Sequence, residues 1–389
     1  MVDRTREKAL RFLGADPEEY DIVFVANATA AIKLVADGFR DMAEKTRAGT
    51  FWYGYHRDAH TSLVGVRELT NGSYWAFEND AQVESWLAGQ LDEQSIGRSH
   101  PGGLGLFAYP GQSNLNGRRL SKDWSRQLRD NPSLRNTYTL FDAAALAMTS
   151  SLADVFANPK TAPDFTCLSF YKIFGFPDVG ALVVKKDAGY LLSGARRYFG
   201  GGTISLLDAI GRSLRHRKKG VDDGNMHALH EGLEDGTLPF HSILALDVAI
   251  DTHRRLYGAD CMDVISRHTA YLGRSLYQGM SGLRYPNGTP VVEIYANDHH
   301  DGGRAFGDSR RQGSTMAFNV LRPDGSYVRW TEVEKLANEQ KVFVRAGGVC
   351  CPGGVYTALR YERWEWDRMF SIGHRCGAEI SLVHEKPTG

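Results

Sequence analysis

The chain has 389 residues, of which 42% are hydrophobic, and its 46 basic residues balance 46 acidic ones. A chain of this length can form a large domain and a smaller one. Balanced charge creates no overall field that would favour nucleic acid or an anionic membrane, and no apolar run approaches the length of a spanning helix. We therefore expect a globular protein that binds neither nucleic acid nor membranes.

The cysteines and histidines show no spacing typical of a metal site. Adjacent histidines point apart on an extended chain, so His299 and His300 favour an exposed loop, and we expect no metal. The first residues, MVDRTREKALRF, lack the apolar core of a secretory signal. An odd number of cysteines without such a signal is typical of a reducing compartment, which predicts a cytoplasmic protein. The five cysteines are Cys167, Cys261, Cys350, Cys351 and Cys376.

Strand-like and helical patterns alternate along the first 245 residues. A helix is expected over Met1–Leu13 and another from about Ile32 to Phe39. The alternation predicts an α/β domain with a mainly parallel, seven-stranded type of sheet and helices on both faces. The expected strands are Ile22–Val25, Phe51–Tyr55, Ser73–Phe77, Leu104–Ala108, Thr137–Phe141, Phe165–Leu168 and Ala181–Val184.

The pattern changes after residue 245. Helices are expected over Leu246–Leu256 and Val264–Met280, and short strands follow between turns. We therefore predict a large domain over residues 1–245 and a smaller α+β domain over residues 246–389. The expected strands of the smaller domain are Val291–Tyr295, Met316–Leu321 and Val342–Val344.

The stretch Ser169–Gly180, SFYKIFGFPDVG, places Lys172 after an apolar strand. A charged amine among apolar residues is disfavoured, so we expect the pKa of Lys172 to fall. A lowered pKa is the property that a Schiff-base lysine needs. The alternative is a lysine whose ammonium group reaches solvent from the strand end, and this stretch alone leaves both open.

Polar residues follow several other expected strands. Gln112 and Asn114 follow one, and Asp142 follows the next. In open α/β sheets, ligands bind beyond the carboxyl ends of the strands. Ala28 and Thr29, between a strand and a helix, offer main-chain N–H groups to a phosphate, although an ordinary helix N-cap explains the same residues.

Pyridoxal phosphate (PLP) needs four protein groups. These are a lysine for the aldehyde, an acid for the pyridine nitrogen, a ring that stacks on the pyridine, and an N–H-rich turn for the phosphate. Lys172, Asp142, His60 and the turn Ala28–Thr29 supply one of each. Each has a structural explanation when taken alone, and their joint occurrence favours a PLP site.

Ten stretches in chain order carry a family resemblance. The chain resembles the class V aminotransferase group of PLP-dependent transferases of fold type I. Within that group it is similar to the amino-terminal, cysteine-desulfurase-like part of molybdenum cofactor sulfurases. The stretches are FVANATAAIKLV, HTSLVGVRE, FAYPGQSNLNGRR, LFDAAALAMTSSLAD, SFYKIFGFPDVGALVV, YFGGGTI, LEDGTLPFHSI, STMAFNVLRPDGSYV, EVEKLA and VRAGGVCCPGG.

The resemblance implies roles for the candidate residues. Lys172 would bind the PLP aldehyde, Asp142 the pyridine nitrogen and His60 the face of the ring. The remaining cofactor contacts would come from Ala28, Thr29, Gln112, Asn114 and Ser169. Thr203, in the GGGT turn, would reach the phosphate of a partner subunit, which implies a homodimer.

Cys350 stands where the resemblance implies a sulfur-accepting thiol. L-Cysteine would be the substrate, Cys350 would carry the sulfur as a persulfide, and an acceptor such as the molybdenum cofactor or a protein would receive it. Arg345 is the candidate for binding the substrate carboxylate. A buried, inert thiol is the alternative for Cys350, but the glycines Gly347 and Gly348 favour a mobile loop.

The chain departs from the family pattern in several places. The family reads GCFCNPG around the sulfur-accepting cysteine, whereas this chain has Gly348 for the first cysteine and Cys351 for asparagine. Two adjacent thiols suggest either a vicinal disulfide or a Cys351 that resolves the persulfide. We also expect the family's first segment, the end of the small domain and the cofactor-receiving domain to be absent. The alternative functions are a PLP-dependent lyase or transferase acting on another amino acid, and an inactive fragment or scaffold.

Overall fold

A computed structural model of the chain forms two compact units. The first unit comprises Met1–His56, Ser62–Gly111 and Ser121–Ile265, and the second comprises the remaining residues. The predicted domain boundary at 245/246 falls inside helix α9 (Phe240–Tyr257), whereas the division into units falls inside helix α10 (Cys261–Ser281). The structure describes residues 1–46, 49–92, 94–97, 102–208, 210–211, 215–217, 229–296, 303, 305–373, 382–383 and 386–387.

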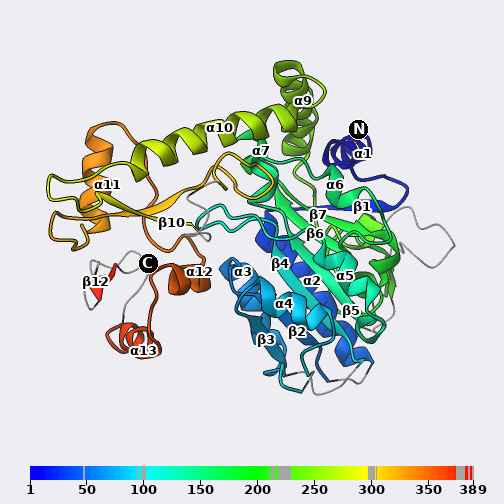
Figure 1. Cartoon of the computed structure of the whole chain (residues 1–389). Helices are drawn as coiled ribbons and strands as arrows, with labels where there is room; N and C mark the ends of the chain where they lie inside the picture. Colours follow the sequence, from blue (N-terminus) through cyan, green and yellow to red (C-terminus); the bar gives the residue numbers. More distant parts are fainter. Residues whose placement is uncertain are drawn as a thin grey trace. The chain divides into compact units, whose positions relative to one another are not determined.

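A seven-stranded sheet forms the centre of the first unit (Figure 1). Its order is β1-β7-β6-β5-β4-β2-β3; β7 is antiparallel to both of its neighbours, and the other pairs are parallel. The predicted α/β class and mainly parallel sheet are therefore confirmed. The strands are β1 (Tyr20–Val25), β2 (Trp52–His56), β3 (Tyr74–Phe77), β4 (Gly105–Pro110), β5 (Thr137–Asp142), β6 (Phe165–Ser169) and β7 (Gly180–Lys185).

Helices cover both faces of this sheet. On one face, the ring of Phe39 in α2 (Ala28–Lys45) contacts Tyr138 of β5. On the other, Trp124 of α5 (Trp124–Asp130) contacts Phe107 of β4. Tyr138 lies directly opposite Leu106 in the register, and neighbouring strand residues point to opposite faces, so Tyr138 and Phe107 belong to different faces. The helices therefore bury apolar side chains from both sides, as the near-continuous apolar strands predict.

The remaining elements of the first unit connect and flank the strands. The α-helices are α1 (Val2–Leu13), α2 (Ala28–Lys45), α3 (Thr61–Val64), α4 (Asp80–Leu87), α5 (Trp124–Asp130), α6 (Ala153–Phe156), α7 (Tyr171–Phe174), α8 (Tyr190–Ser193) and α9 (Phe240–Tyr257). Short 3-10 turns lie at Gly65–Leu69, Pro132–Leu134, Leu146–Met148, Lys186–Ala188 and Leu229–Gly232, and strands β8 (Ile204–Leu207) and β9 (Arg215–Arg217) form a separate hairpin.

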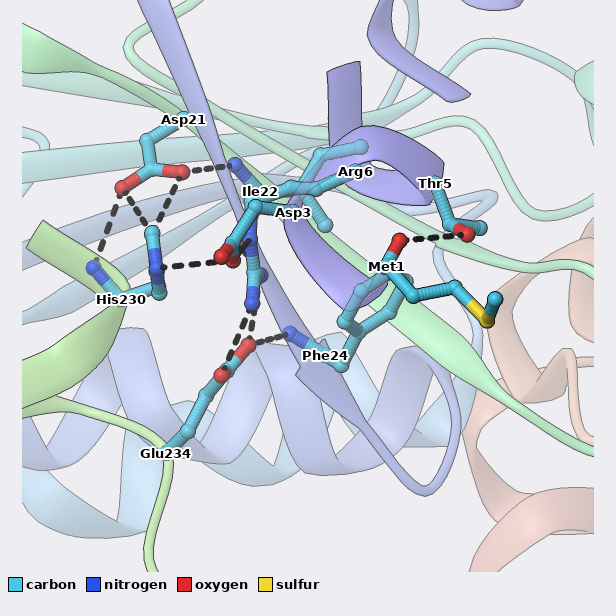
Figure 2. A network of polar contacts seen from close by, with 9 residues as sticks. All are labelled: Met1, Asp3, Thr5, Arg6, Asp21, Ile22, Phe24, His230 and Glu234. Atoms are coloured by element: carbon cyan, nitrogen blue, oxygen red, sulfur yellow. Dashed lines mark hydrogen bonds and ion pairs between the residues drawn. The ribbon is translucent and has the colours of Figure 1, made fainter. Parts of the chain in front are cut away.

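A buried ion pair fastens α1 to the edge strand β1 (Figure 2). Arg6 donates two hydrogen bonds to the Glu234 carboxylate, at 2.7 and 3.0 Å, and both side chains are buried. Glu234 also accepts from the main-chain N–H of Phe24 at 2.7 Å, and Arg6 donates to the carbonyl of Ile22. These bonds satisfy main-chain groups of an edge strand that would otherwise be available to pair with another chain.

The second unit is built on a hairpin, helices and a small core. Strands β10 (Val292–Tyr295) and β11 (Ala317–Val320) pair antiparallel, and Val355, Tyr361 and Met369 are its buried cluster. Its other elements are α10 (Cys261–Ser281, shared with the first unit), α11 (Trp330–Glu339), α12 (Pro352–Ala358), α13 (Arg363–Ser371), β12 (Leu382–Val383) and β13 (Lys386–Pro387).

One predicted strand of the smaller domain is wrong. Residues Val342–Val344 form neither a strand nor a helix, and the side chains of Val342 and Phe343 are exposed. Within the described residues, β10 and β11 pair only with each other, so this apolar run has no strand partner for its main-chain groups. The run therefore has the apolar composition of a strand, but no described strand pairs with it.

Candidate active site

The candidate lysine lies just beyond the carboxyl end of β6. The chain leaves the buried strand at Ser169 and makes one helical turn, α7, which Gly175 ends at a φ of 78°. Lys172 lies within this turn and is exposed. The expectation that apolar residues enclose it is therefore wrong, because the turn carries Lys172 away from the apolar strand.

Asp142 ends the neighbouring strand β5; the residue is 7% exposed, and its carboxylate accepts a hydrogen bond from the Ala144 N–H at 2.9 Å. Directly opposite in the register is Cys167 of β6. Burial raises the pKa of the Cys167 thiol well above its usual value, the charge and hydrogen bond of Asp142 raise it further, and Lys172 opposes them. Because β5 and β6 are parallel, Asp142 at the end of β5 and Lys172 in the turn after β6 occupy the same edge of the sheet.

The start of α2 lies at this edge too. Asn27 caps the helix, accepting from the Ala30 N–H at 3.1 Å, so the N-cap interpretation of this turn is confirmed. The Ala28 N–H donates to the Ser169 hydroxyl at 3.0 Å, which ties the turn to the end of β6. The hydroxyls of Thr29 and Ser62 are 2.8 Å apart.

Gly180 permits this close approach between strand and turn. A Cβ at Gly180 would come within 2.5 Å of the main chain of Asn27. Val25 pairs with Gly180 at the ends of β1 and β7, so any side chain at this glycine would push the α2 turn away from the sheet.

Thr203 is buried, at 2% exposed, and its hydroxyl donates to the Gly200 carbonyl at 2.8 Å. Asp235 organises this turn: its carboxylate accepts from the Gly200 N–H at 2.7 Å and pairs with Arg196. Sequence reasoning missed Asp235, because its partners lie more than 30 residues away in the chain.

The other candidate residues belong to the second unit. They are His60, Gln112, Asn114, Arg345 and Cys350, whereas Ala28, Thr29, Asp142, Ser169, Lys172 and Thr203 belong to the first unit. His60 is half-buried and Arg345 is exposed. Gln112 is buried, and its side-chain oxygen accepts from Arg119 Nε at 3.2 Å.

The second unit brings three distant segments together at Cys350. Asn114 donates from its side-chain amide to the Val349 carbonyl at 2.5 Å, and the Thr61 N–H donates to the Cys350 carbonyl at 2.9 Å. His60 precedes Thr61 in the chain, so the segments that carry His60, Asn114 and Cys350 lie close together. Sequence reasoning nominated these three residues individually but missed the supporting contacts, which have no local signal.

The Cys350 turn has a strained backbone. Val349 and Cys350 have φ values of 44° and 61°, a region that costs a side-chain-bearing residue about 1–2 kcal/mol. Cys350 is exposed, so the alternative of a buried thiol is wrong. Its neighbour Cys351 is 0% exposed, and both thiols are free, so the vicinal disulfide is not formed.

The described residues include no group of three or more histidine, cysteine, aspartate or glutamate side chains placed to hold a metal ion. His299 and His300 lie outside the described residues. None of the helices in the described part of the chain has the length and apolar character needed to cross a bilayer.

The fold matches that of solved cysteine desulfurases. The apo cysteine desulfurase of Thermococcus onnurineus superposes with a TM-score of 0.63 at 17% identity, covering 92% of this chain and 76% of that one. A cystine C-S lyase in complex with its product cysteine persulfide gives a TM-score of 0.58 at 15% identity, covering 88% of this chain and 79% of that one. The chain therefore has the fold type I architecture of PLP-dependent enzymes.

The sequence relationship is more specific. The chain is 47% identical over 388 residues to the molybdenum cofactor sulfurase of Aspergillus niger, covering 100% of this chain and 44% of that protein. The resemblance to molybdenum cofactor sulfurases is therefore confirmed along the whole chain. The chain spans less than half the length of the curated relatives it matches. No family model matches it.

Proposed function

We propose that this chain is a PLP-dependent cysteine desulfurase of the molybdenum cofactor sulfurase type, which moves sulfur from L-cysteine to Cys350 and on to an acceptor. The observation that carries the proposal is the 47% identity to such a sulfurase along the whole chain. The exposed thiol of Cys350 and the amine and carboxylate at the sheet edge supply the groups that the reaction needs.

The residues at the sheet edge fit PLP chemically. Lys172 offers an exposed primary amine for the aldehyde, and the buried Asp142 offers a carboxylate for the pyridine nitrogen. Thr29 and the main chain at the start of the 18-residue helix α2 offer donors for a phosphate, where the helix dipole also favours negative charge. Ser169 holds this turn through the Ala28 N–H. When bound, PLP withdraws the electron pair that is left on the substrate carbon.

The protein's own groups then have separate tasks. Lys172 would move a proton to and from the substrate carbon, and His60, Asn114 and Gln112 would contribute to holding the cofactor. Arg345, exposed and cationic, binds the substrate carboxylate. The Cys350 thiolate attacks the sulfur of L-cysteine: an S–S bond forms, the carbon–sulfur bond of the substrate breaks, and the protonated product is alanine. In the last step the S–S bond of the Cys350 persulfide breaks, its outer sulfur passes to the acceptor, and a thiol reductant supplies the two electrons that return Cys350 to its thiolate; we propose that the acceptor is the molybdenum cofactor.

A PLP-dependent lyase acting on a sulfur amino acid is the second candidate. The fold match to a cystine C-S lyase favours it, because that enzyme has the same architecture. A Cys350→Ala variant separates the two functions. Release of alanine from L-cysteine, measured by amino-acid analysis, stops in this variant if Cys350 accepts the sulfur. Turnover of the substrate continues if the chain is a lyase.

We further propose a homodimer in the cytoplasm. The resemblance implies that Thr203 reaches the partner's phosphate, whereas in the single chain this residue is buried and its hydroxyl donates to the Gly200 carbonyl. The support for a subunit contact is therefore the exposed aromatic side chain of Tyr198, five residues earlier. An exposed free thiol such as Cys350 persists best in a reducing compartment. Light scattering of the purified chain tests the dimer: a single-chain mass at micromolar concentration would contradict it.

A further inference from the structure

The two adjacent cysteines of the second unit are in opposite environments. Cys350 is exposed, whereas Cys351 has no exposed surface and begins helix α12 as its N-cap. The Cys351 thiol donates to the Asp58 carbonyl at 3.4 Å. A Cβ at Gly354 would come within 2.7 Å of the Cys351 sulfur, so the thiol is also closely covered by its own helix.

Three hydrogen bonds hold the turn in this orientation, and we call them the clasp. They run from the Asn114 amide to the Val349 carbonyl, from the Thr61 N–H to the Cys350 carbonyl, and from the Cys351 thiol to the Asp58 carbonyl. The clasp joins the Cys350 turn to segments that lie more than 200 residues earlier.

The clasp is itself supported by charge and packing. Arg118 pairs with the Asp58 carboxylate at 2.9 Å, and both side chains are largely buried. A Cβ at Gly353 would come within 2.3 Å of the Arg57 carbonyl, so α12 starts in direct contact with the segment that accepts the Cys351 thiol. Since Val349 and Cys350 have strained φ values, the turn depends on these contacts and relaxes when they are lost.

A freed Cys351 would destroy a persulfide on its neighbour. Its thiolate would attack the inner sulfur of the Cys350 persulfide, form a Cys350–Cys351 disulfide and release hydrosulfide. Atoms and electrons balance without an added oxidant, because the outer sulfur leaves with the electron pair. The bound sulfur would then be lost before it reached an acceptor.

We propose that the clasp keeps the Cys350 thiol accessible for sulfur transfer and keeps the Cys351 thiol buried, where it cannot attack a persulfide. Asn114, Thr61 and Cys351 are then positioning residues that preserve the persulfide. This inference rests on the proposed function of Cys350. Cys351 is then neither a resolving thiol nor a second sulfur carrier.

Alkylation tests the clasp without turnover. Burial, followed by the charge of Asp58, raises the pKa of Cys351 to about 12, so roughly one thiol in ten thousand is ionised at pH 8. With limiting iodoacetamide and peptide mass spectrometry, we expect Cys350 to react at least about 100-fold faster than Cys351. Equal rates in the wild-type chain would overturn the proposal.

A proline at the start of α3 removes one bond of the clasp. Thr61 is the first residue of α3, a position that accepts proline, so Thr61→Pro deletes the N–H that binds the Cys350 carbonyl. Thr61→Val keeps that N–H and is the matched control. We expect Thr61→Pro, but not Thr61→Val, to raise the alkylation rate of Cys351 at least about tenfold. Asn114→Ala, which removes a different bond of the clasp, is the second variant if Thr61→Pro does not fold.

Hydrosulfide release then tests the consequence. Each chain is loaded at Cys350 with inorganic polysulfide, desalted and followed without reductant. We expect release at least about fivefold faster in Thr61→Pro than in the wild type, and a return to the wild-type rate in Thr61→Pro/Cys351→Ser. Fast release that persists without Cys351 would overturn the proposal. Failure of L-cysteine to load Cys350 would count against the proposed function, whereas polysulfide loading still decides the role of the clasp.

Discussion

The side-chain amide of Asn114 donates to the main-chain carbonyl of Val349 at 2.5 Å, across 235 residues of sequence. In the sequence, Asn114 follows strand β4 of the large sheet, and Val349 precedes Cys350, the candidate sulfur-accepting residue. One hydrogen bond thus links a residue nominated for the cofactor to the turn nominated for sulfur. The second unit therefore organises the residues that we propose handle sulfur.

Replacing Asn114 with alanine should destabilise the chain even without cofactor. The variant leaves the Val349 carbonyl without this donor, which costs about 1 kcal/mol for a hydrogen bond of this kind. Urea denaturation of the apo chain measures the change, with Asn338→Ala on the exposed side of α11 as control. Equal stability of the two variants would show that the Asn114 bond contributes nothing.

The Arg6–Glu234 pair should make a large contribution to stability. Glu234→Ala leaves a buried guanidinium and the Phe24 N–H without their carboxylate, and we expect a loss of about 3–5 kcal/mol. Arg11→Ala breaks an exposed pair with Glu7 and should cost less than about 0.5 kcal/mol. Thermal unfolding compares them. The apolar double variant Arg6→Met/Glu234→Leu should recover part of the loss, and similar values for Glu234→Ala and Arg11→Ala would refute this assignment.

Stability should decline at alkaline pH partly through Cys351. Burial, followed by the charge of Asp58, raises the pKa of this thiol from an ordinary 9.0 to about 12. The folded state therefore holds the proton more tightly, so the contribution is constant below pH 9 and is lost as the pH rises towards 12. The stability of the wild type relative to Cys351→Ser should fall by up to about 1.4 kcal/mol per pH unit above pH 9. Urea titrations at pH 8, 9 and 10 measure this difference; a constant value would contradict the buried thiol.

Lys172→Ala should lose firm binding of PLP. The amine at the end of β6 is the group proposed to bind the aldehyde, and no other group named at this edge can replace it. After incubation with PLP and gel filtration, the wild type should retain visible absorbance and the variant should not. Lys186→Ala, at the other end of β7, is the control. Absorbance retained by Lys172→Ala would remove this lysine from the site.

Most of the large sheet could be predicted because its strands are buried on both faces. Such strands appear as short apolar runs, as in β4 and β6, where every residue is buried. The run Val342–Val344 has the same composition, yet no sequence pattern shows whether a partner strand exists. Pairing is a tertiary property, so this prediction failed where the others succeeded.

Candidate site residues could be nominated one by one from the sequence, but the contacts between them could not. Polar residues after strands nominated Asp142 and Lys172 as candidates, because parallel strands end at the same edge. The exposed position of Lys172 depends on the one-turn helix that Gly175 ends. The contacts of Cys351 with Asp58 and of Cys350 with Thr61 join positions about 290 residues apart, and no local pattern encodes them.

The most direct test of the central claim is the mass of the Cys350 peptide after the chain is incubated with PLP and L-cysteine. The account predicts one added sulfur atom on Cys350, removable by a thiol reductant, and none on Cys351. The same peptide from Lys172→Ala should remain unmodified. An unmodified Cys350 in the wild type, or an equal persulfide in Lys172→Ala, would contradict a PLP-dependent transfer of sulfur to Cys350.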